Sequence, residues 1–135
     1  MAEMTPELSV LVPFYNESGN IDPLLSEIHD VLNGIPFEVI CINDCSDDST
    51  GDELAQAEHK WPDTVRVFTH VRRAGKSAAL ATGLREVRGI WVQLLDGDGQ
   101  NDPADTRRLW DTIIVPNENP RIGIIAGRRT SRNDS

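Results

Sequence analysis

The sequence predicts an α/β fold: a three-layer, αβα, Rossmann-like domain with a mostly parallel sheet. Short, nearly continuous apolar runs alternate with segments whose apolar residues recur at helical spacing. Apolar runs without polar alternation are typical of parallel strands that helices cover on both faces. A chain of 135 residues is long enough for one domain with a substantial core and too short for two.

The expected elements follow one another in a regular order. The predicted strands are rich in β-branched residues and cover residues 8–14, 37–42, 65–69, 90–95 and 122–127. The predicted helices lie at residues 21–32, 50–60, 77–88 and 102–115. Asn20 or Asp22 is expected to cap the first helix, with Pro23 in its first turn. The third helix is expected to present Leu80, Leu84 and Val87 to the core.

Charge and composition exclude several classes of protein. Lys and Arg number 13 against 22 Asp and Glu, and this net charge of −9 does not suit a nucleic-acid binder with a basic face. No apolar run approaches the ~18 residues that span a bilayer, and the beginning MAEMTPE is too acidic and polar for a signal peptide. Cys41 and Cys45 lack partners for a zinc site and are expected to be reduced thiols. His29 and His59 are expected on the surfaces of helices.

Charged and amide residues follow the predicted strands at their carboxyl ends. Ligands of parallel α/β sheets bind beyond these ends. The segments there are PFYNE (13–17), NDCSDD (43–48), HVRRAGK (70–76), DGDGQND (96–102) and GRR (127–129). We therefore expect one edge of the sheet to collect oxygen ligands and cations.

The segment DGDGQ has the residue types of a metal site. Asp96 ends a strand, so Asp96 and Asp98 can direct carboxylates to one point outside the sheet, and Gly97 allows a sharp turn with room for a ligand. Two carboxylates and the amide oxygen of Gln100 suit Mg²⁺ or Mn²⁺. The alternative is a solvated turn whose Asp102 caps the next helix, and the residues alone leave both open.

Other motifs of this kind fit less well. An EF-hand loop from Asp96 would need Gly and Glu where Asn101 and Arg107 stand. AGKSAAL resembles the end of a P-loop, but His70 stands where that loop needs Gly. A receiver-type signalling domain, an alternative of another functional class, needs an acidic pair after the first strand, where residues 13–15 are Pro-Phe-Tyr.

The strand-end motifs occur together in the order and spacing of family 2 glycosyltransferases. The motifs SVLVPFYNE, CINDCSDDST, RAGKSAALATGL, LLDGDGQNDP and IIAGRR cover about residues 8–129. LDGDGQNDP together with PFYNE resembles the polyprenyl-phosphate (dolichol-phosphate) mannosyltransferase branch. The resemblance implies a nucleotide-sugar-binding GT-A fold truncated after the fifth strand. Residues 8–130 would be the nucleotide-sugar-binding domain, between flexible ends at 1–7 and 131–135, with the acceptor half absent.

The resemblance also implies roles for individual residues. Those implied to bind the nucleotide are Pro13, Tyr15, Glu17, Asp44, Gly75, Lys76 and Asp96. Asp44 would hydrogen-bond the base, and Lys76 would offset charge on the diphosphate. Asp96, Asp98 and Gln100 would hold Mg²⁺ or Mn²⁺. Asp98 and Arg129 would be catalytic, at the metal and at a phosphate near the reaction centre.

A few residues depart from the family pattern. Asn43 replaces the commoner Asp, Cys45 stands where Gly is frequent, and Arg73 stands where Asn often does. Asn43 is isosteric with Asp and still accepts hydrogen bonds, so nucleotide binding is expected to survive. Gly99 replaces a frequent Leu, and nothing explains that change.

The implied reaction is a metal-dependent, inverting transfer of a sugar to a polyprenyl or dolichyl phosphate, with mannose from GDP-mannose as the expected donor. The alternative is a family 2 transferase that uses a UDP-sugar to make a polysaccharide or another glycan. The chain would be the donor-binding part, inactive alone and without a nucleic-acid partner. The full-length enzyme is expected to be cytoplasmic, at the cytoplasmic face of the membrane, and held there by the missing C-terminal part.

Overall fold

The computed structural model describes residues 5–97, 102–112 and 123–125 of the chain. Its strands are β1 (Leu8–Phe14), β2 (Phe37–Asn43), β3 (Val65–Thr69), β4 (Trp91–Leu94) and β5 (Gly123–Ile125). Its helices are α1 (Ile21–Val31), α2 (Thr50–Lys60), α3 (Lys76–Leu84) and α4 (Pro103–Thr112). The strands form one sheet in the order β3-β2-β1-β4-β5, and their described pairings are parallel, so the predicted parallel sheet is confirmed.

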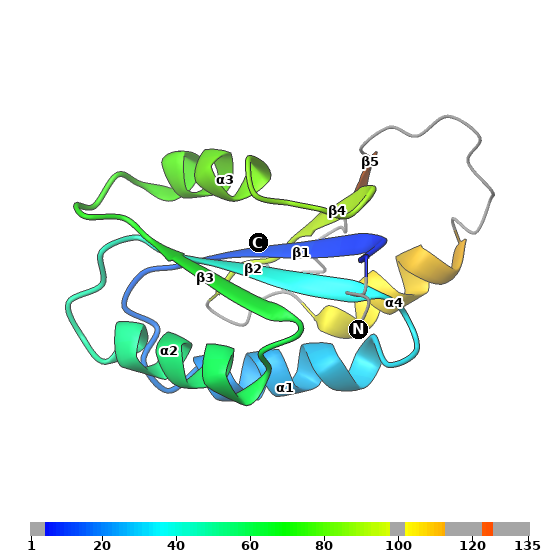
Figure 1. Cartoon of the computed structure of the whole chain (residues 1–135), viewed down its shortest axis with the longest axis horizontal. Coiled ribbons are helices and arrows are strands. Elements are labelled where there is room, and N and C mark those ends of the chain that lie inside the picture. The colour runs from blue at the N-terminus through cyan, green and yellow to red at the C-terminus, as the bar shows by residue number, and fades with distance from the viewer. Residues whose placement is uncertain (1–4, 98–101, 113–122, 126–135) are drawn as a thin grey trace, which may run out of the picture.

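Helices cover both faces of the sheet and give it three layers (Figure 1). Helix α3 packs on one face, against β1 and β2, and α1, α2 and α4 lie on the other. A hydrophobic core lies on each face of the sheet, and the central strand β1 contributes side chains to both, because successive side chains of a strand point to opposite faces. Leu8 and Val10 belong to the core under α1 and α2, whereas Leu11 belongs to the core under α3. Burial on both faces explains the continuous apolar runs, and the predicted αβα architecture is confirmed.

A buried carboxylate fixes the edge of the sheet opposite the strands' carboxyl ends. The Glu38 side chain on β2 is 1% exposed. It accepts hydrogen bonds from Ser9 Oγ (2.6 Å), Arg66 Nη1 (3.2 Å), Arg88 N (2.8 Å) and Arg88 Nε (3.0 Å). The N–H of Gly89 in turn donates to Ser9 Oγ at 2.9 Å. These bonds draw the segment before β4 onto the sheet and make it incompatible with continued helix.

Helix α3 is shorter than predicted, and its predicted core residues are confirmed only in part. Leu80 and Val87 pack, partly buried, against the core under α3, as predicted. The pattern predicts a helix over 77–88, but α3 ends at Leu84, because the next residues form a turn that leads to the bonds of Glu38. Leu84, predicted to face the core, is 42% exposed. Ala79 and Gly83 are buried instead, and a Cβ at position 83 would clash with Leu11. Close approach of the helix to the sheet therefore decides which face is buried.

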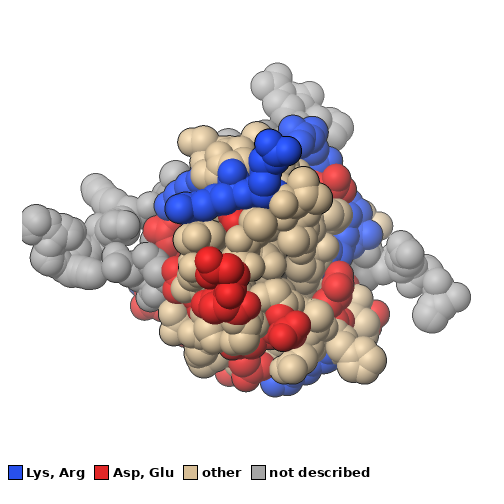
Figure 2. All heavy atoms as spheres, turned by 90° about the vertical axis from the view of Figure 1, so that its left-hand side faces the viewer, with Lys and Arg blue, Asp and Glu red and all other residues tan. Residues whose placement is uncertain are grey.

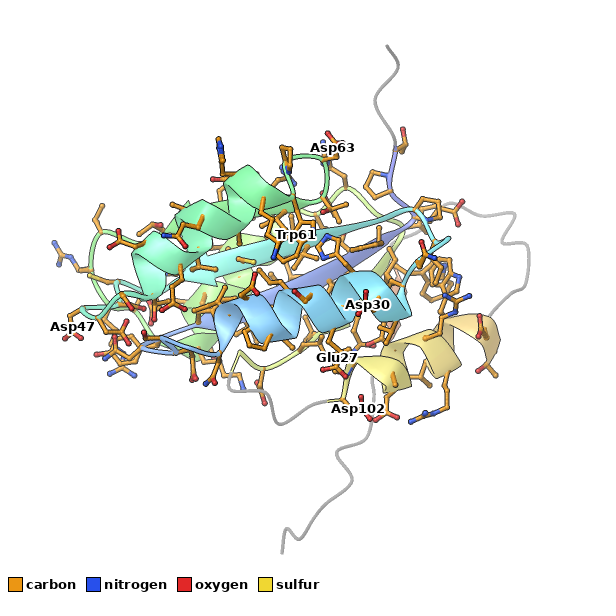
Figure 3. All side chains as sticks on the ribbon, turned by 90° about the horizontal axis from the view of Figure 1, so that it is seen from below. Glu27, Asp30, Asp47, Trp61, Asp63 and Asp102 are labelled. Atoms are coloured by element: carbon orange, nitrogen blue, oxygen red, sulfur yellow. The ribbon has the colours of Figure 1, made fainter. Side chains whose placement is uncertain are left out.

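The remaining boundaries agree with the sequence to within a residue or two. Helix α1 follows Asn20, but the Asn20 amide donates to Glu17 Oε1 (2.9 Å) and makes no side-chain cap. Asp102 does cap α4, since its Oδ1 accepts the Ala104 N–H at 3.0 Å (Figure 3). The predicted residues 113–115, 122 and 126–127 lie outside the described residues. None of the described helices has the length and apolar character needed to cross a bilayer.

His29 is half-buried, so its predicted place on the surface is wrong. Its ring stacks on Trp61 at a centroid distance of 4.5 Å, between α1 and the end of α2 (Figure 3). Its Nδ1–H donates to the Leu25 carbonyl (2.7 Å), and its Nε2 lies 2.6 Å from Thr64 Oγ1. Burial lowers the pKa of His29 below its ordinary 6.5 despite the Leu25 bond. His59 is exposed, as predicted.

Candidate functional site

A cavity of about 170 Å³ opens at the carboxyl edge of the sheet, which faces the viewer in Figure 2. Its walls come from the segments that follow β1, β2, β3 and β4. The lining residues are Pro13, Phe14, Tyr15, Glu17, Asp44, Arg73, Lys76, Ala79, Asp96 and Gly97. Six of the residues predicted to bind a nucleotide thus meet at one cavity, and the seventh, Gly75, contacts Asp44.

The loops after β1 and β2 are held together by bonds between side chains and backbone. Asn16 donates its N–H to Ser46 Oγ (3.0 Å), and its Oδ1 accepts the Asp47 N–H (2.9 Å). Glu17 donates its N–H to Thr50 Oγ1 at 2.8 Å. Figure 3 shows Asp47 at this edge of the molecule. These bonds fix the backbone that carries the cavity residues of the first loop before any ligand arrives.

The departures at positions 43 and 45 have structural explanations. Asn43 is 4% exposed, and its Oδ1 accepts the Ser46 N–H at 3.0 Å, as an Asp in its place would. Cys45 has a φ of +60°, in the left-handed region that favours glycine, which accounts for the Gly frequent there. Its thiol lies 3.6 Å from the Val71 carbonyl. Both cysteines are free thiols, and burial raises the pKa of Cys41.

Asp44 organises the loop of residues 70–75 between β3 and α3, which we call the β3–α3 loop. Its Oδ1 accepts the Ala74 N–H (2.9 Å) and Nδ1–H of His70 (2.8 Å), and its Oδ2 accepts the Gly75 N–H (2.9 Å). Burial raises the pKa of Asp44, but these three hydrogen bonds outweigh it, so the pKa lies below its ordinary value. Asp44 is therefore ionised at neutral pH, and it both lines the cavity and holds this loop.

His70 is a member of the site that sequence reasoning missed. Its Nδ1 contacts Asp44, and its Nε2 lies 2.8 Å from Thr82 Oγ1 on α3. In the sequence, His70 stands out only because it fills a glycine position of the P-loop pattern. A histidine directly after a strand was the available signal, but nothing in the sequence indicated its two partners.

Arg73 is a second missed residue. Its guanidinium carbon lies 3.8 Å from the centre of the Tyr15 ring, and its Nε lies 3.9 Å from Asp44 Oδ2. A guanidinium over an aromatic face is attractive, so Arg73 and Tyr15 form a planar wall of the cavity. The departure from the family's Asn thus adds a cation to the cavity.

Lys76 and Asp96 form an ion pair in the wall of the cavity. Their Nζ and Oδ1 atoms are 2.5 Å apart, and the side chains are 61% and 21% exposed. Lys76 is the first residue of α3, whose amino end favours anions. In Figure 2, Lys and Arg gather over the upper part of this edge and Asp and Glu below them.

Gly97 is needed for close approach to β1. A Cβ at this position would lie 2.6 Å from the Pro13 carbonyl oxygen and 2.6 Å from the Phe14 ring. The space beside Gly97 was predicted to hold a ligand, but the neighbouring strand β1 occupies it. This contact places Asp96 directly beside the end of β1.

Three predicted site residues lie outside the described residues: Asp98, Gln100 and Arg129. Within the described part of the chain, no group of three His, Cys, Asp or Glu side chains is arranged to hold a metal. Asp96 is the one predicted ligand whose place is known, and its carboxylate in the cavity is compatible with a divalent cation.

The sequence matches the model of glycosyl transferase family 2 over residues 9–134. The chain belongs to this family. The match confirms the resemblance, and a receiver domain is no longer an alternative.

Individual relatives agree with this assignment. The chain is 31% identical over 107 residues to a dolichol-phosphate mannosyltransferase of Pyrococcus furiosus, which covers 79% of this chain and 30% of that protein. Among solved structures, the mannosyltransferase PcManGT from Pyrobaculum calidifontis, in complex with GDP-Man and Mn²⁺, is 27% identical with a TM-score of 0.70, over 82% of this chain and 33% of that one. TarS of S. aureus, residues 1–349 in complex with UDP-GlcNAc, is 28% identical with a TM-score of 0.58, over 68% of this chain and 26% of that one. The GT-A fold is thereby confirmed, and the chain spans about a third of its relatives' length.

Proposed function

We propose that the whole protein transfers a sugar from a nucleoside diphosphate sugar to a polyprenyl phosphate, and that this chain holds the donor. The observation that carries the proposal is one cavity with a buried acceptor, Asp44, at one side and the pair Lys76 and Asp96 at the other. The chain's similarity to a dolichol-phosphate mannosyltransferase supports the acceptor class.

The described residues suit the parts of such a donor. Asp44 accepts a hydrogen bond from the base, next to the wall that Tyr15 and Arg73 form. Lys76, at the amino end of α3, stabilises the diphosphate, because both its ammonium group and the helix end favour negative charge. Glu17, held by Thr50, closes the cavity on the side of the first loop.

A divalent cation would lie between the donor's diphosphate and Asp96, Asp98 and Gln100. When bound, Mg²⁺ or Mn²⁺ would stabilise the charge that grows on the departing nucleoside diphosphate. Hard oxygen donors fit either ion. The Mn²⁺ in the PcManGT complex supports a divalent metal without deciding between the two. Arg129 would add a cation near the reaction centre.

The acceptor attacks the anomeric carbon from the face opposite the diphosphate, which inverts the configuration. A lipid phosphate is already an anion, so its attack needs no strong general base. The acceptor wall and the membrane contact would lie outside this donor-binding unit, at the cytoplasmic face of the membrane. Residues 8–130 act as the donor-binding unit in this proposal.

GDP-mannose is the first donor to test, because the mannosyltransferase branch is the one that the motifs resemble. A UDP-sugar is the second candidate, and a specific observation favours it. Three of the hydrogen bonds that Asp44 can accept are already taken within the chain, which limits what it can accept from a base.

Calorimetric titration of the chain with GDP, UDP, GDP-mannose and UDP-glucose, with and without Mn²⁺, tests the proposal. We expect metal-dependent binding of a nucleoside diphosphate. Asp98→Ala should weaken diphosphate binding in Mn²⁺ but leave free nucleoside affinity unchanged. Asp63→Ala, on the surface far from the cavity (Figure 3), is the matched control. Equal affinity of parent and Asp98→Ala with the fold intact would contradict the metal assignment.

Transfer itself is tested with labelled donor, Mn²⁺ and a short polyprenyl phosphate. We expect no labelled lipid from this chain alone, since positioning both reactants is worth up to ~7–11 kcal/mol of barrier. Robust turnover would place the acceptor site within residues 1–135 and overturn the division of labour.

A further inference from the structure

We propose that His70 sets the base selectivity of the donor cavity, by holding Asp44 so that its carboxylate has room for one hydrogen bond from the base. This arrangement favours uracil over guanine. The inference rests on the proposed function, because it concerns which base the donor carries.

The hydrogen bonds of Asp44 can be counted. An ionised carboxylate accepts about four, two on each oxygen. Oδ1 is filled by the Ala74 N–H and by His70, and Oδ2 receives the Gly75 N–H. Arg73 Nε at 3.9 Å from Oδ2 is too far for a hydrogen bond. Among residues 5–97, 102–112 and 123–125, these three hydrogen bonds are the ones that the Asp44 carboxylate accepts, and they leave one acceptor position on Oδ2.

The remaining position is on the oxygen next to a cavity residue. Asp44 and Arg73 both line the cavity, and the Arg73 Nε lies 3.9 Å from Oδ2, so we infer that the free position on Oδ2 faces the cavity. Bonds to both oxygens fix the rotation of the carboxylate. The Asp44 side chain is 5% exposed, so the cavity offers a ligand its main route to Oδ2.

His70 is itself held in one orientation. The ionised carboxylate can only accept, so Nδ1 of His70 must carry the hydrogen that it donates. In the neutral ring, Nε2 then accepts from the Thr82 hydroxyl, which lies 2.8 Å away. Thr82 thus keeps the ring turned toward Asp44, and His70 acts as a positioning residue without touching the donor.

The two bases differ in what they present to a carboxylate. Uracil has a single ring N–H, which lies between two carbonyl groups. Guanine has a ring N–H beside an exocyclic amino group, and these two parallel donors pair best with both oxygens of a carboxylate. With Oδ1 occupied, one guanine donor facing Asp44 stays unpaired, which is costly away from water. In the orientation that His70 imposes, Asp44 can therefore accept the one ring N–H of uracil but only one of the two donors of guanine.

Calorimetric titration of the chain with UDP and with GDP in Mn²⁺ tests the proposal. We expect the chain to bind UDP about tenfold more tightly than GDP, the effect of one unpaired donor. His70→Leu releases Oδ1 and lets the carboxylate turn, so the ratio should fall toward one. His70→Asn keeps a donor near the place of Nδ1 and should restore most of the ratio, and His59→Leu on the surface should leave it unchanged.

The outcomes separate selectivity from structure. A merely structural His70 would weaken both nucleotides equally in His70→Leu, and an unchanged ratio would overturn the proposal. If His70→Leu does not fold, the ratio in the unaltered chain still decides, since equal or tighter GDP binding also overturns it. A ¹⁵N NMR spectrum that shows hydrogen on Nε2 alone in the neutral ring would contradict the positioning. Failure of both nucleotides to bind would instead refute the proposed function.

Discussion

Asp44→Asn replaces a buried carboxylate that two backbone N–H groups approach from opposite sides. Ala74 donates to one oxygen and Gly75 to the other, each at 2.9 Å. An amide has only one oxygen, so either orientation of the Asn side chain sets its NH₂ group against a backbone N–H. Rotation of the side chain cannot relieve this conflict. One charge-assisted bond is lost and a buried donor is left unpaired, so we expect the free energy of unfolding to fall by about 3 kcal/mol.

Urea denaturation at pH 7 measures this change, and Asn43→Asp is the matched control. Asn43 is also buried, at 4% exposed, but its Oδ1 only accepts the Ser46 N–H, so the reverse substitution should cost under about 1 kcal/mol. The pKa of Asp44 lies below its ordinary 3.8, so its stabilising effect is present above that pH and lost as pH falls through the lowered value. The difference in the free energy of unfolding between the parent and Asp44→Asn should therefore become smaller at acidic pH.

Two results would contradict these roles of Asp44. If Asp44→Asn unfolds at the same urea concentration as the parent, the β3–α3 loop does not depend on Asp44. If the variant is destabilised but binds uridine as tightly as the parent, Asp44 is only a loop anchor and its contact with the base is wrong.

Three further predictions concern the rest of the molecule. Because burial lowers the pKa of His29 below 6.5, the free energy of unfolding should be highest above pH 6.5 and fall as the pH drops from 6.5 toward the lowered value. Urea midpoints at pH 7.5 and 5.5 should show this dependence, and it should be lost in His29→Gln and kept in His59→Gln. Glu38→Gln should lower the free energy of unfolding by about 2–4 kcal/mol, which is near the low end for buried ion pairs because Arg66 and Arg88 are partly exposed. A urea midpoint equal to that of the parent within error would contradict this prediction. Gly97→Ala sets a Cβ against the Pro13 carbonyl and should cost about 1–3 kcal/mol and weaken nucleotide binding, as calorimetry can check; unchanged affinity would mean that the segment moves freely.

The fold was predictable because the strongest signal in the sequence is also the main physical driving force. Strands buried on both faces are largely apolar, and β2 shows this from Phe37 to Asn43, where every residue is buried and only Glu38 and Asn43 are polar. Helix orientation was less predictable where side chains are small. In α3, Ala79 and Gly83 face the sheet because they allow close approach, and a pattern search favours the larger Leu84.

The site was predictable in its location and incomplete in its members. The strand-end rule brings Tyr15, Asp44 and Lys76 to one edge, and the structure places all three at one cavity. His70 and Arg73 were missed because their roles depend on Asp44, which lies at another strand end and is 26 residues from His70 along the chain, and spacing does not reveal such contacts. The hydrogen bonds between the loops after β1 and β2 could not be predicted for the same reason, since Asn16 contacts Asp47 only after folding.

Charge compensation explains how this edge can hold acids and cations together before any donor binds. Asp96 follows β4 in a partly buried position, where an uncompensated carboxylate would be costly, and the Lys76 ammonium at 2.5 Å supplies an opposite charge. Lys76 is 61% exposed, so it can reach other anions at small cost in packing. A diphosphate beside α3 would offer Lys76 a second partner, and a divalent cation would take over the compensation of Asp96. The diphosphate would draw Lys76 away from Asp96, and the metal would draw Asp96 away from Lys76. Each ligand therefore frees the group that the other binds, so metal and diphosphate should bind more tightly together than either does alone.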